Sequence, residues 1–369
     1  MVAFAAGAAA LVAGGALKGI VAIAASLGLL TLALRRAFTE PSAATGRAAR
    51  RERKVLIVNP RSGGGKAARF ELVQEASRRG IEPVVLGPSD DLRSLAEDAA
   101  RRADVIGMAG GDGSQALVAG VASDHDVAFV CVPAGTRNHF ALDLGIDRDD
   151  VVAALDAFDA ASSVERRIDL AEVNGRTFVN NVSLGVYAEI VKDDRYRDAK
   201  IATAARLLPD LLDASRPVAA VTFAGPGGEV HEGSRLLLVS NNPYVLGRPF
   251  GFGGRPSLST GRLGILAIDV ADAAQAAQLV SLQSVGAVNR FDGWNEWTAA
   301  ELTVHAEAPV AAGIDGEPAV LVAPLVFSTA PLALRVRLSA DADRRRVRRS
   351  KEHAGAGEVL ESLWALAAG

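Results

Sequence analysis

The stretch KVLIVNPRSGGGK, residues 54–66, decides the fold class of this chain. Its apolar run ends at Asn59-Pro60, and three consecutive glycines then lead into a segment with helical spacing. A short apolar run closed by such turn residues is typical of a buried strand. Three more runs of this kind follow along the chain: EPVVLGP (82–88), DVIGMAGG (104–111) and VAFVCVP (127–133).

Amphipathic stretches separate these strands. Residues 66–79, 91–102 and 114–121 have the spacing of helices that bury one face. Strands that alternate with helices in this way predict a parallel sheet covered on both faces. In such a fold ligands bind at the carboxyl ends of the strands, so the loops that follow the strands are the place to look for a site.

The loop after the first strand suits an anion. Its glycines allow backbone N–H groups to turn toward a phosphate, and the next helix adds the positive end of its dipole. It is not a Walker A loop, because Pro60 and Ala67 stand where that motif needs Gly and Ser or Thr. A tight connection without a ligand is the alternative. The residues assigned to nucleotide binding here are Asn59, Ser62, Gly63, Gly64 and Lys66.

Two further loops at the same sheet edge are rich in glycine and short polar residues. The third strand ends in GGDGS (110–114), and the fourth runs into PAGTRNHFA (133–141). Asp112 between glycines can reach a phosphate or a metal, and Ser114 can cap the following helix; a plain glycine turn capped by Asp112 is the alternative. Three such loops together predict a nucleotide site. The residues assigned to it from these two loops are Gly111, Asp112, Gly113, Ser114, Thr136 and Asn138.

The second half of the chain is rich in strands. Residues 166–185 predict two strands joined by an Asn174-Gly175 turn, and residues 218–242 repeat the hairpin pattern. Only 193–215 and 271–285 have helical spacing there. We therefore expect an α/β domain followed by a β-rich domain.

The ordered motifs NPRSGGGK, GGDGS and PAGTRNHFA resemble those of the diacylglycerol kinase catalytic-domain family. More closely, the chain resembles the bacterial soluble-type lipid kinases, whose relatives include sphingosine and ceramide kinases. The resemblance extends from about residue 54 to 338. It implies a doubly wound parallel α/β nucleotide-binding domain like that of phosphofructokinases and NAD kinases, followed by a β-sandwich that binds lipid.

The family's remaining signature corresponds to Ile314-Asp315-Gly316-Glu317. The resemblance implies ATP and Mg²⁺ as cofactors, a lipid hydroxyl as phosphate acceptor and a role in phospholipid metabolism. It assigns Asp315 as the general base and both Asp112 and Glu317 to the metal, which makes Asp315, Asp112 and Glu317 the candidate catalytic residues. Relatives that resemble sphingosine kinases suggest Asp112 as the base instead. A solvated Asp-Gly hairpin turn is the non-functional interpretation of residues 314–317.

Two positions depart from the family pattern. His139 stands where many members have Asp, and Thr260-Gly261 replaces the usual Asp-Gly of the second domain. The change at Thr260 brings the acceptor site or a magnesium network into question.

The organisation predicted from these patterns has five parts. We expect an apolar membrane-anchor segment at 1–35, a basic linker at 36–53, the nucleotide-binding domain at 54–165, the β-sandwich at 166–340, and a basic tail with a C-terminal helix at 341–369. The apolar segment followed by basic residues predicts a protein anchored at the cytoplasmic face of the membrane.

Composition excludes several classes of function. Forty Lys and Arg against 43 Asp and Glu give a net charge of −3, which lacks the basic excess of nucleic-acid-binding proteins. A single cysteine excludes an internal disulfide and a CxxC zinc or redox site. Three functions stay open: a lipid kinase, a kinase of a soluble substrate, or a catalytically silent nucleotide-binding membrane protein. The expected partners are a lipid substrate and a membrane surface, with a homodimer left open.

Overall fold

The computed structural model describes residues 52–185, 219–234, 236–245, 254–284 and 287–353. The chain divides into two compact units, 1–47 and 48–369. The first unit lies wholly outside the described residues, and all helices and strands named here belong to the second.

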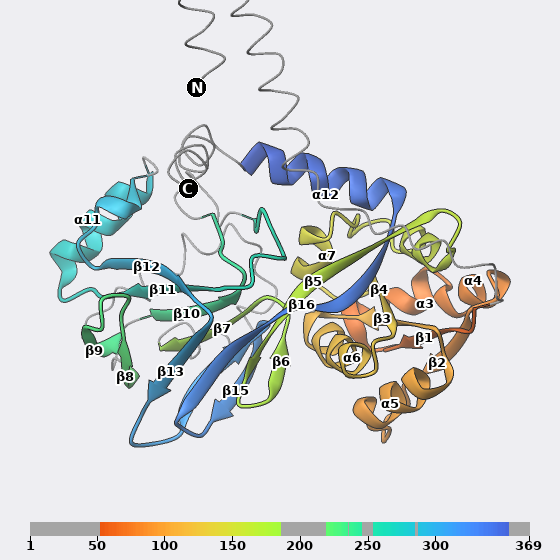
Figure 1. The fold of residues 1–369 in the computed structure, drawn as a ribbon, viewed down its shortest axis with the longest axis horizontal. Coiled ribbons are helices and arrows are strands. Elements are labelled where there is room, and N and C mark those ends of the chain that lie inside the picture. The colour runs from red at the N-terminus through yellow and green to blue at the C-terminus, as the bar shows by residue number, and fades with distance from the viewer. Residues whose placement is uncertain (1–51, 186–218, 235, 246–253, 285–286, 354–369) are drawn as a thin grey trace, which may run out of the picture. The chain divides into compact units, whose positions relative to one another are not determined.

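The first part of this unit is a parallel sheet with helices (Figure 1). Strands β1 (Lys54–Val58), β2 (Glu82–Val85), β3 (Val105–Gly110) and β4 (Ala128–Pro133) lie in the order β2-β1-β3-β4 and run parallel. Every residue of β3 and β4 is buried, which requires cover on both faces of the sheet. The predicted parallel α/β sheet is therefore confirmed.

The helices follow the strands as expected, with one interruption. They are α3 (Lys66–Arg69), α4 (Leu72–Arg78), α5 (Leu92–Arg102), α6 (Asp112–Asp124) and α7 (His139–Asp143), with short 3₁₀ helices η1 (Ser62–Gly64) and η2 (Ala153–Phe158). The single helix predicted at 66–79 is split because Glu71 has a left-handed backbone, with φ of 48°.

Antiparallel strands build the second part. Sheet A continues past β4 through β16 (Leu325–Ser339), β13 (Glu301–His305), β8 (Ala219–Ala224) and β9 (Val230–Ser234). Strand β5 (Ser163–Val173) pairs with β16, and β6 (Arg176–Phe178) pairs with β5. Sheet B has the order β12-β11-β10-β7-β14-β15. Its strands are β7 (Asn181–Gly185), β10 (Leu236–Asn241), β11 (Leu263–Ile268), β12 (Trp294–Ala299), β14 (Val310–Ile314) and β15 (Glu317–Leu321).

The two sheets form a sandwich. One apolar cluster takes residues from both, including Phe178 and Phe327 from sheet A and Val239 and Ile314 from sheet B. The predicted hairpin turn is present, because Asn174 and Gly175 both have positive φ between β5 and β6. The expected α/β domain followed by a β-sandwich is thus confirmed.

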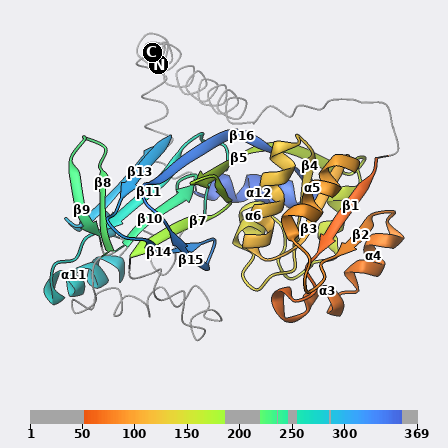
Figure 2. The same ribbon diagram turned by 90° about the horizontal axis from the view of Figure 1, so that it is seen from below.

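The long strands β5 and β16 link the parallel and antiparallel parts (Figure 2). They pair antiparallel along most of their length, while Val336 of β16 pairs in parallel with Phe129 of β4. The domain boundary at 165/166 stays a prediction.

The remaining described helices are α11 (Ala273–Ser284), the short η4 (Val288–Arg290) and α12 (Ala340–His353). The predicted helix at 271–285 corresponds to α11, and the basic tail enters α12. The predicted helices at 193–215 and within the C-terminal tail lie outside the described residues.

The predicted location at a membrane, by contrast, is wrong. In the described part of the chain no helix is both long and apolar enough to cross a bilayer. The physical reason is length and charge: a span needs about 20 apolar residues, whereas α12, with 14 residues, carries mostly charged side chains. The segment 1–35, on which the expectation rested, lies outside the described residues.

Candidate functional site

The three glycine loops meet in direct backbone contact. A Cβ atom on Gly63 would overlap the carbonyl oxygen of Ala134, and one on Gly135 would overlap the Cα of Gly111. The first loop therefore packs on the third, and the third packs on the second. Glycine is required at these points because any side chain would force the loops apart.

The first loop is held by its own short-range bonds. Asn59 Oδ1 accepts the backbone N–H of Arg61 (3.1 Å), and the N–H of Gly65 donates to the carbonyl of Ser62 (3.1 Å). Gly64 has a positive φ of 63° and a Cβ there would meet nothing within 4 Å. The open side of Gly64 leaves room for a ligand against the backbone, as the sequence predicts for a phosphate loop.

The third loop is shaped by Asn138, which is only 2% exposed. Its Nδ2 donates to the carbonyls of Pro133 (3.1 Å) and Gly135 (2.8 Å), and its Oδ1 accepts the N–H of Gly135 (2.9 Å). The Asn138 side chain therefore holds the shape of the loop itself. Thr136, at the tip of the same loop, is exposed and is the member of the predicted pair that faces outward.

Asp112 ties the second loop to the helix that follows the third. The backbone N–H of His139 donates to Oδ2 of Asp112 (2.9 Å) and that of Phe140 to Oδ1 (3.2 Å). Asp112 thereby caps α7 from the neighbouring loop. Helix α6 itself begins at Asp112 with Gly111 as its cap residue, so Ser114 lies inside the first turn and is not the cap that the sequence suggests.

The electrostatics of this contact pull in opposite directions. Burial raises the pKa of Asp112, while the nearby His139 ring, the two backbone N–H groups and Arg255 lower it. Burial likewise lowers the pKa of His139, against the pull of the Asp112 and Asp143 carboxylates. His139 begins α7 and touches Asp112 through its backbone, so the departure from Asp at this position keeps the connection between the two loops.

The turn 315–317 brings the family's last motif to the same place. Asp315, with a left-handed φ of 49°, accepts three backbone N–H groups: Val179 on Oδ2 (3.0 Å), and Asn180 (2.7 Å) and Asn181 (3.2 Å) on Oδ1. Burial and the neighbouring Asp112 raise the pKa of Asp315 to about 7, although the three backbone bonds oppose this.

Glu317 completes the meeting of the two motifs. A Cβ on Gly113 would overlap the Glu317 carboxylate, so this carboxylate lies against the first turn of α6. The structure therefore brings the predicted catalytic residues Asp112, Asp315 and Glu317 together. They belong to segments about 200 residues apart in the sequence.

A chain of basic residues runs along the third loop, and of its members the sequence analysis assigned only Lys66. Lys66 Nζ donates to the carbonyl of Arg148 (3.3 Å), and Arg148 Nη1 donates to the carbonyl of Arg137 (2.8 Å). Nη1 of Arg137 would be 3.7 Å from a Cβ on Gly316. Arg137 was visible beside Thr136 in the motif, whereas nothing in the sequence connects Arg148 to it.

Two buried polar residues were also missed. Gln115 Nε2 donates to the carbonyls of Met108 (2.9 Å) and Val132 (2.9 Å), which joins the ends of β3 and β4 behind the loops. Arg255, 5% exposed, forms a salt bridge with Asp143 of α7 (2.7 Å). Its position after a glycine run suggests a loop and gives no sign of a buried ion pair.

The second departure, Thr260, is accommodated by local hydrogen bonds. Its backbone N–H (2.8 Å) and its hydroxyl (2.6 Å) both donate to Oδ1 of Asn242. The N–H of Gly261 donates to Oδ2 of Asp169 (2.7 Å). In this chain the hydroxyl of Thr260 therefore secures the turn without an acidic side chain.

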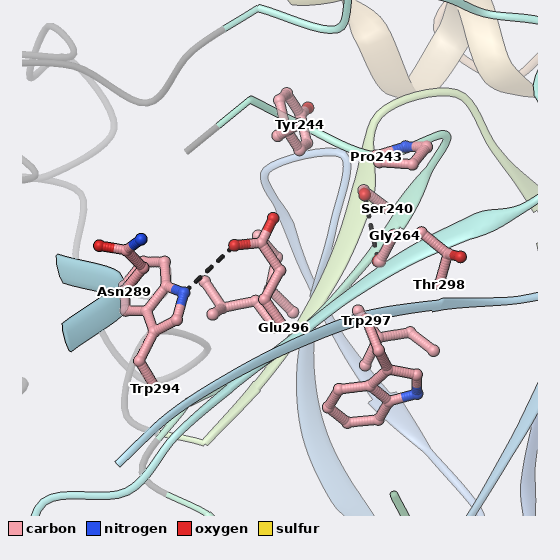
Figure 3. Close-up of a pocket in the computed structure, with 12 residues that line it drawn as sticks. Ser240, Pro243, Tyr244, Gly264, Asn289, Trp294, Glu296, Trp297 and Thr298 are labelled. Atoms are coloured by element: carbon pink, nitrogen blue, oxygen red, sulfur yellow. Dashed lines mark hydrogen bonds between the residues drawn. The ribbon is translucent and has the colours of Figure 1, made fainter. Parts of the chain in front are cut away.

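A cavity of about 450 Å³ lies at sheet B (Figure 3). Strands β10, β11 and β12 supply its floor, with apolar and polar side chains in mixture. Trp294 Nε1 donates to Glu296 (3.2 Å) at one end, and Tyr244 stands at the other. Its lining is Leu238, Ser240, Pro243, Tyr244, Gly264, Ile265, Leu266, Asn289, Trp294, Glu296, Trp297 and Thr298.

Tyr244 connects this cavity to the loop junction. Its hydroxyl accepts a hydrogen bond from Asn181 Nδ2 (3.3 Å), and the backbone of Asn181 binds Asp315. The Tyr244 ring also lies under the guanidinium of Arg255, 5.4 Å from its centroid. The cavity thus ends next to the candidate base.

Within the described residues no group of three or more His, Cys, Asp or Glu could hold a metal ion. Magnesium in kinase-type sites is commonly held by one or two carboxylates together with the substrate's phosphates. The pair Asp112 and Glu317 fits that smaller requirement.

Comparisons with known proteins agree with this geometry. A family model described as the diacylglycerol kinase catalytic domain matches residues 53–173. A curated relative, diacylglycerol kinase of Bacillus subtilis (strain 168), is 34% identical over 149 residues, which is 38% of this chain and 48% of the relative. The match therefore spans about half the length of that relative.

Solved structures extend the likeness to the fold of the second part. Two structures of diacylglycerol-kinase-type proteins from Bacillus anthracis str. Sterne align with TM-scores of 0.61 and 0.57, at 19% and 21% identity. The alignments cover 79% and 78% of this chain and 97% and 98% of those chains. At this identity they show a shared fold, and the family model shows that residues 53–173 of this chain are similar to the diacylglycerol kinase catalytic domain.

Proposed function

We propose that the protein is a lipid kinase that transfers the γ-phosphate of ATP, with Mg²⁺, to the hydroxyl of diacylglycerol or a related lipid. One observation carries the proposal. Three glycine loops in backbone contact share their junction with the Asp315–Glu317 turn. Phosphoryl transfer needs positioned phosphates, neutralised charge and a proton acceptor, and these groups stand together here.

The first loop and the basic chain serve the phosphates. The open backbone at Gly64 offers N–H groups to an anion, and Lys66, Arg137 and Arg148 place positive charge beside the third loop. Charge of this sign stabilises the oxygens of the transferring phosphoryl group. Thr136 is exposed at the loop tip, where it can bind the nucleotide, while Asn138 acts by shaping the loop.

Asp315 is the better candidate for the base. The Asp112 side chain is 8% exposed, whereas Asp315 is half-buried and is easier for an acceptor to reach. The pKa of Asp315, about 7, matches a base that works near neutral pH. In the proposed step the acceptor hydroxyl gives its proton to Oδ2 of Asp315, its oxygen bonds to the γ-phosphorus, and the bond to ADP breaks.

Glu317, with Asp112, would hold Mg²⁺ beside the first turn of α6. A bound Mg²⁺ supplies charge neutralisation for the phosphate oxygens. Glu317 is exposed, so its carboxylate is accessible from solvent for this role.

The cavity on sheet B is the proposed place for the acceptor's apolar part. A volume of about 450 Å³ is within the range of small-molecule sites. Its Tyr244 end lies one hydrogen bond from Asn181, whose backbone binds Asp315. An amphipathic acceptor could therefore bury its chain against Leu238 and Leu266 and present its hydroxyl toward the base. A lipid is accordingly the proposed partner, while the absence of nucleic-acid binding and a homodimer stay predictions.

The test is transfer of radiolabelled γ-phosphate from ATP with magnesium to mixed micelles of diacylglycerol, monoacylglycerol, ceramide or sphingoid base. The proposal predicts label in an organic-extractable product and identifies the acceptor by which micelle is labelled. Label confined to a water-soluble product, or none while ATP still binds, would contradict it in favour of a soluble substrate or a silent site.

A cavity variant tests the acceptor's location in the same assay. Leu238→Trp fills the cavity from its half-buried floor and should raise the acceptor KM about tenfold or more, with the ATP KM unchanged. Val320→Trp, on an exposed position of β15 outside the cavity, is the matched control and should leave both constants unchanged. An unchanged acceptor KM in Leu238→Trp would place the acceptor elsewhere.

A further inference from the structure

Arg255 is buried at the point where the parallel and antiparallel parts of the chain meet. Its Nε (2.7 Å) and Nη2 (2.7 Å) reach one carboxylate oxygen of Asp143, which belongs to α7. Its Nη1 donates to the carbonyls of Val179 (2.5 Å) and Asn241 (2.8 Å), and its Nη2 donates to Asn180 Oδ1 (2.9 Å). One side chain therefore grips α7 of the nucleotide-binding part and three residues of the β-sandwich.

The groups that Arg255 grips are the ones that hold the two candidate catalytic carboxylates. On one side, Asp143 ends the short helix α7, whose first two N–H groups bind Asp112. On the other, Val179 and Asn180 accept from Arg255 through oxygen atoms and donate their backbone N–H groups to Asp315. The guanidinium is thus the middle of a continuous chain of contacts from Asp112 to Asp315.

A third contact leads to the acceptor cavity. The Arg255 guanidinium stacks over the ring of Tyr244, which stands at the end of the cavity next to Asn181. Arg255 therefore contacts three kinds of residue: one in the helix that holds Asp112, two that hold the candidate base Asp315, and one in the wall of the cavity.

The chemistry of this position demands arginine. A buried charge is costly unless it is paired and hydrogen-bonded, and here the ion pair with Asp143 and three oxygen acceptors satisfy it. Only a planar guanidinium presents enough donors in a fixed fork to reach four groups on different segments and stack on a ring. A lysine could keep the charge near Asp143 but could not reach the other acceptors at once.

We infer that Arg255, with Asp143, is a positioning residue of the proposed kinase, which sets the distance between the nucleotide loops and Asp315 and aligns the acceptor cavity with both. The inference rests on the proposed function. The hydrogen bonds of Arg255 reach α7 and the β-sandwich and not the first glycine loop, so its loss should displace the base and the acceptor while nucleotide binding is retained.

The test compares Arg255→Lys, Arg255→Met and Asp143→Asn with a control that also loses a buried arginine and its ion pair. The control is Arg337→Met. It removes a buried arginine near the C-terminal end of β16 that forms two hydrogen bonds with Glu52 (2.7 and 2.6 Å). Both methionine variants lose a buried ion pair and should lose similar thermal stability. Asp143→Asn keeps the shape of the site and serves if the arginine variants do not fold.

The expected result is a split between kinetic constants, measured per folded enzyme. Because a misplacement of about 1 Å can reduce a rate about 100-fold, Arg255→Lys and Arg255→Met should lose about 30- to 100-fold in kcat, with the nucleotide Kd within about threefold of wild type. Arg337→Met should keep kcat within about twofold. Retention of kcat in Arg255→Lys, or an equal loss in Arg337→Met, would overturn the inference.

Hydrogen exchange separates failure of this inference from failure of the proposed function. Backbone amides of 179–181 and 139–140 should exchange faster in Arg255→Lys, because this substitution removes contacts that hold these segments. In Arg337→Met they should exchange at the wild-type rate, because the contacts of Arg255 stay in place. If the wild-type protein transfers no phosphate, the proposed function fails. The exchange pattern then still tests whether Arg255 holds these two segments in place. Unchanged protection at 179–181 in Arg255→Lys would overturn the inference whatever the activity.

Discussion

At the scale of single residues, the site depends on carboxylates that accept backbone N–H groups. Asp112 and Asp315 each bind the start of a segment that comes from elsewhere in the sequence. A carboxylate can accept two or more N–H groups at once, whereas an amide offers one acceptor oxygen and adds two donors. Replacement of Asp by Asn at these positions therefore removes charge and also places donor against donor.

Asp112→Asn should destabilise the loop junction. One of the N–H groups of His139 and Phe140 would lose its acceptor, which costs about 1–3 kcal/mol in free energy of unfolding for a buried group. Denaturant unfolding should show this loss. Asp159→Asn, at an exposed turn where water can replace the bonds to Ala161 and Ser162, is the control. Wild-type stability in Asp112→Asn would show that the contact with α7 carries no weight.

At the scale of elements, the glycine loops offer a matched pair of substitutions. Gly63 and Gly64 have nearly the same positive φ, 57° and 63°, so alanine is strained by about 1 kcal/mol at either place. Only at Gly63 would the added Cβ also overlap the third loop, at the carbonyl of Ala134. Gly63→Ala should therefore lower the free energy of unfolding by about 1 kcal/mol or more beyond the loss in Gly64→Ala, measured by denaturant unfolding. Equal effects of the two substitutions would mean that the contact between the loops is unimportant.

The elements also show what the sequence could predict. Short apolar runs and the residues that close them predicted β1 to β4 and the loops after them, because burial on both faces and turn geometry are local requirements. The sequence assigned Asn138 to nucleotide binding, but in the structure its amide faces inward to the loop. The direction of a polar side chain depends on the path of the backbone. The left-handed φ of 52° at Asn138 could not be predicted from the order of residues in the motif.

Long-range partners were beyond the reach of the sequence. Arg255 and Asp143 lie 112 positions apart, and only the packed fold brings them within 2.7 Å. Gln115 directly follows the GGDGS motif, yet its role depends on carbonyls from two different strands. A single sequence carries patterns of period and turn, whereas such pairs are set by how the two parts of the chain pack.

At the scale of the whole molecule, β16 is the strand that joins the parallel and antiparallel parts, and a partly buried ion pair stabilises its C-terminal end. Glu52 accepts two bonds from Arg337 of β16, and this lowers the pKa of Glu52 below its ordinary value of 4.5. A group whose pKa is lowered on folding adds stability above its unfolded pKa, and that stability is lost as the pH falls through the folded value.

Glu52→Gln should therefore show a stability difference that depends on pH. At pH 7 the variant should unfold about 1–2 kcal/mol more easily than wild type, since a bond to a charged group is lost. As the pH falls below 4.5 and through the lowered pKa of folded Glu52, the two proteins should converge, because protonation of Glu52 removes the same interaction from wild type. Urea titrations across pH 3–8 measure this. A difference that stays constant over the range would show that the charge on Glu52 contributes nothing.

The central claim is that the meeting of the glycine loops with the 315–317 turn is one phosphoryl-transfer site, with Asp315 as its base. The most direct measurement is the single-turnover rate of γ-phosphate transfer to the lipid acceptor by Asp315→Asn, beside Asp169→Asn as control. Asp169 is buried and likewise accepts backbone N–H groups on both carboxylate oxygens, from Gly261 (2.7 Å), which follows Thr260, and from Leu332 of β16 (2.8 Å).

Both variants lose a similar set of bonds, so both should lose stability, but only one removes the proposed base. If Asp315 is the general base, Asp315→Asn should transfer phosphate at least about 100-fold more slowly than wild type. Asp169→Asn should stay within about threefold of wild type per folded enzyme. Equal rates in the two variants, with both still binding nucleotide, would contradict the assignment of Asp315 and with it the central claim.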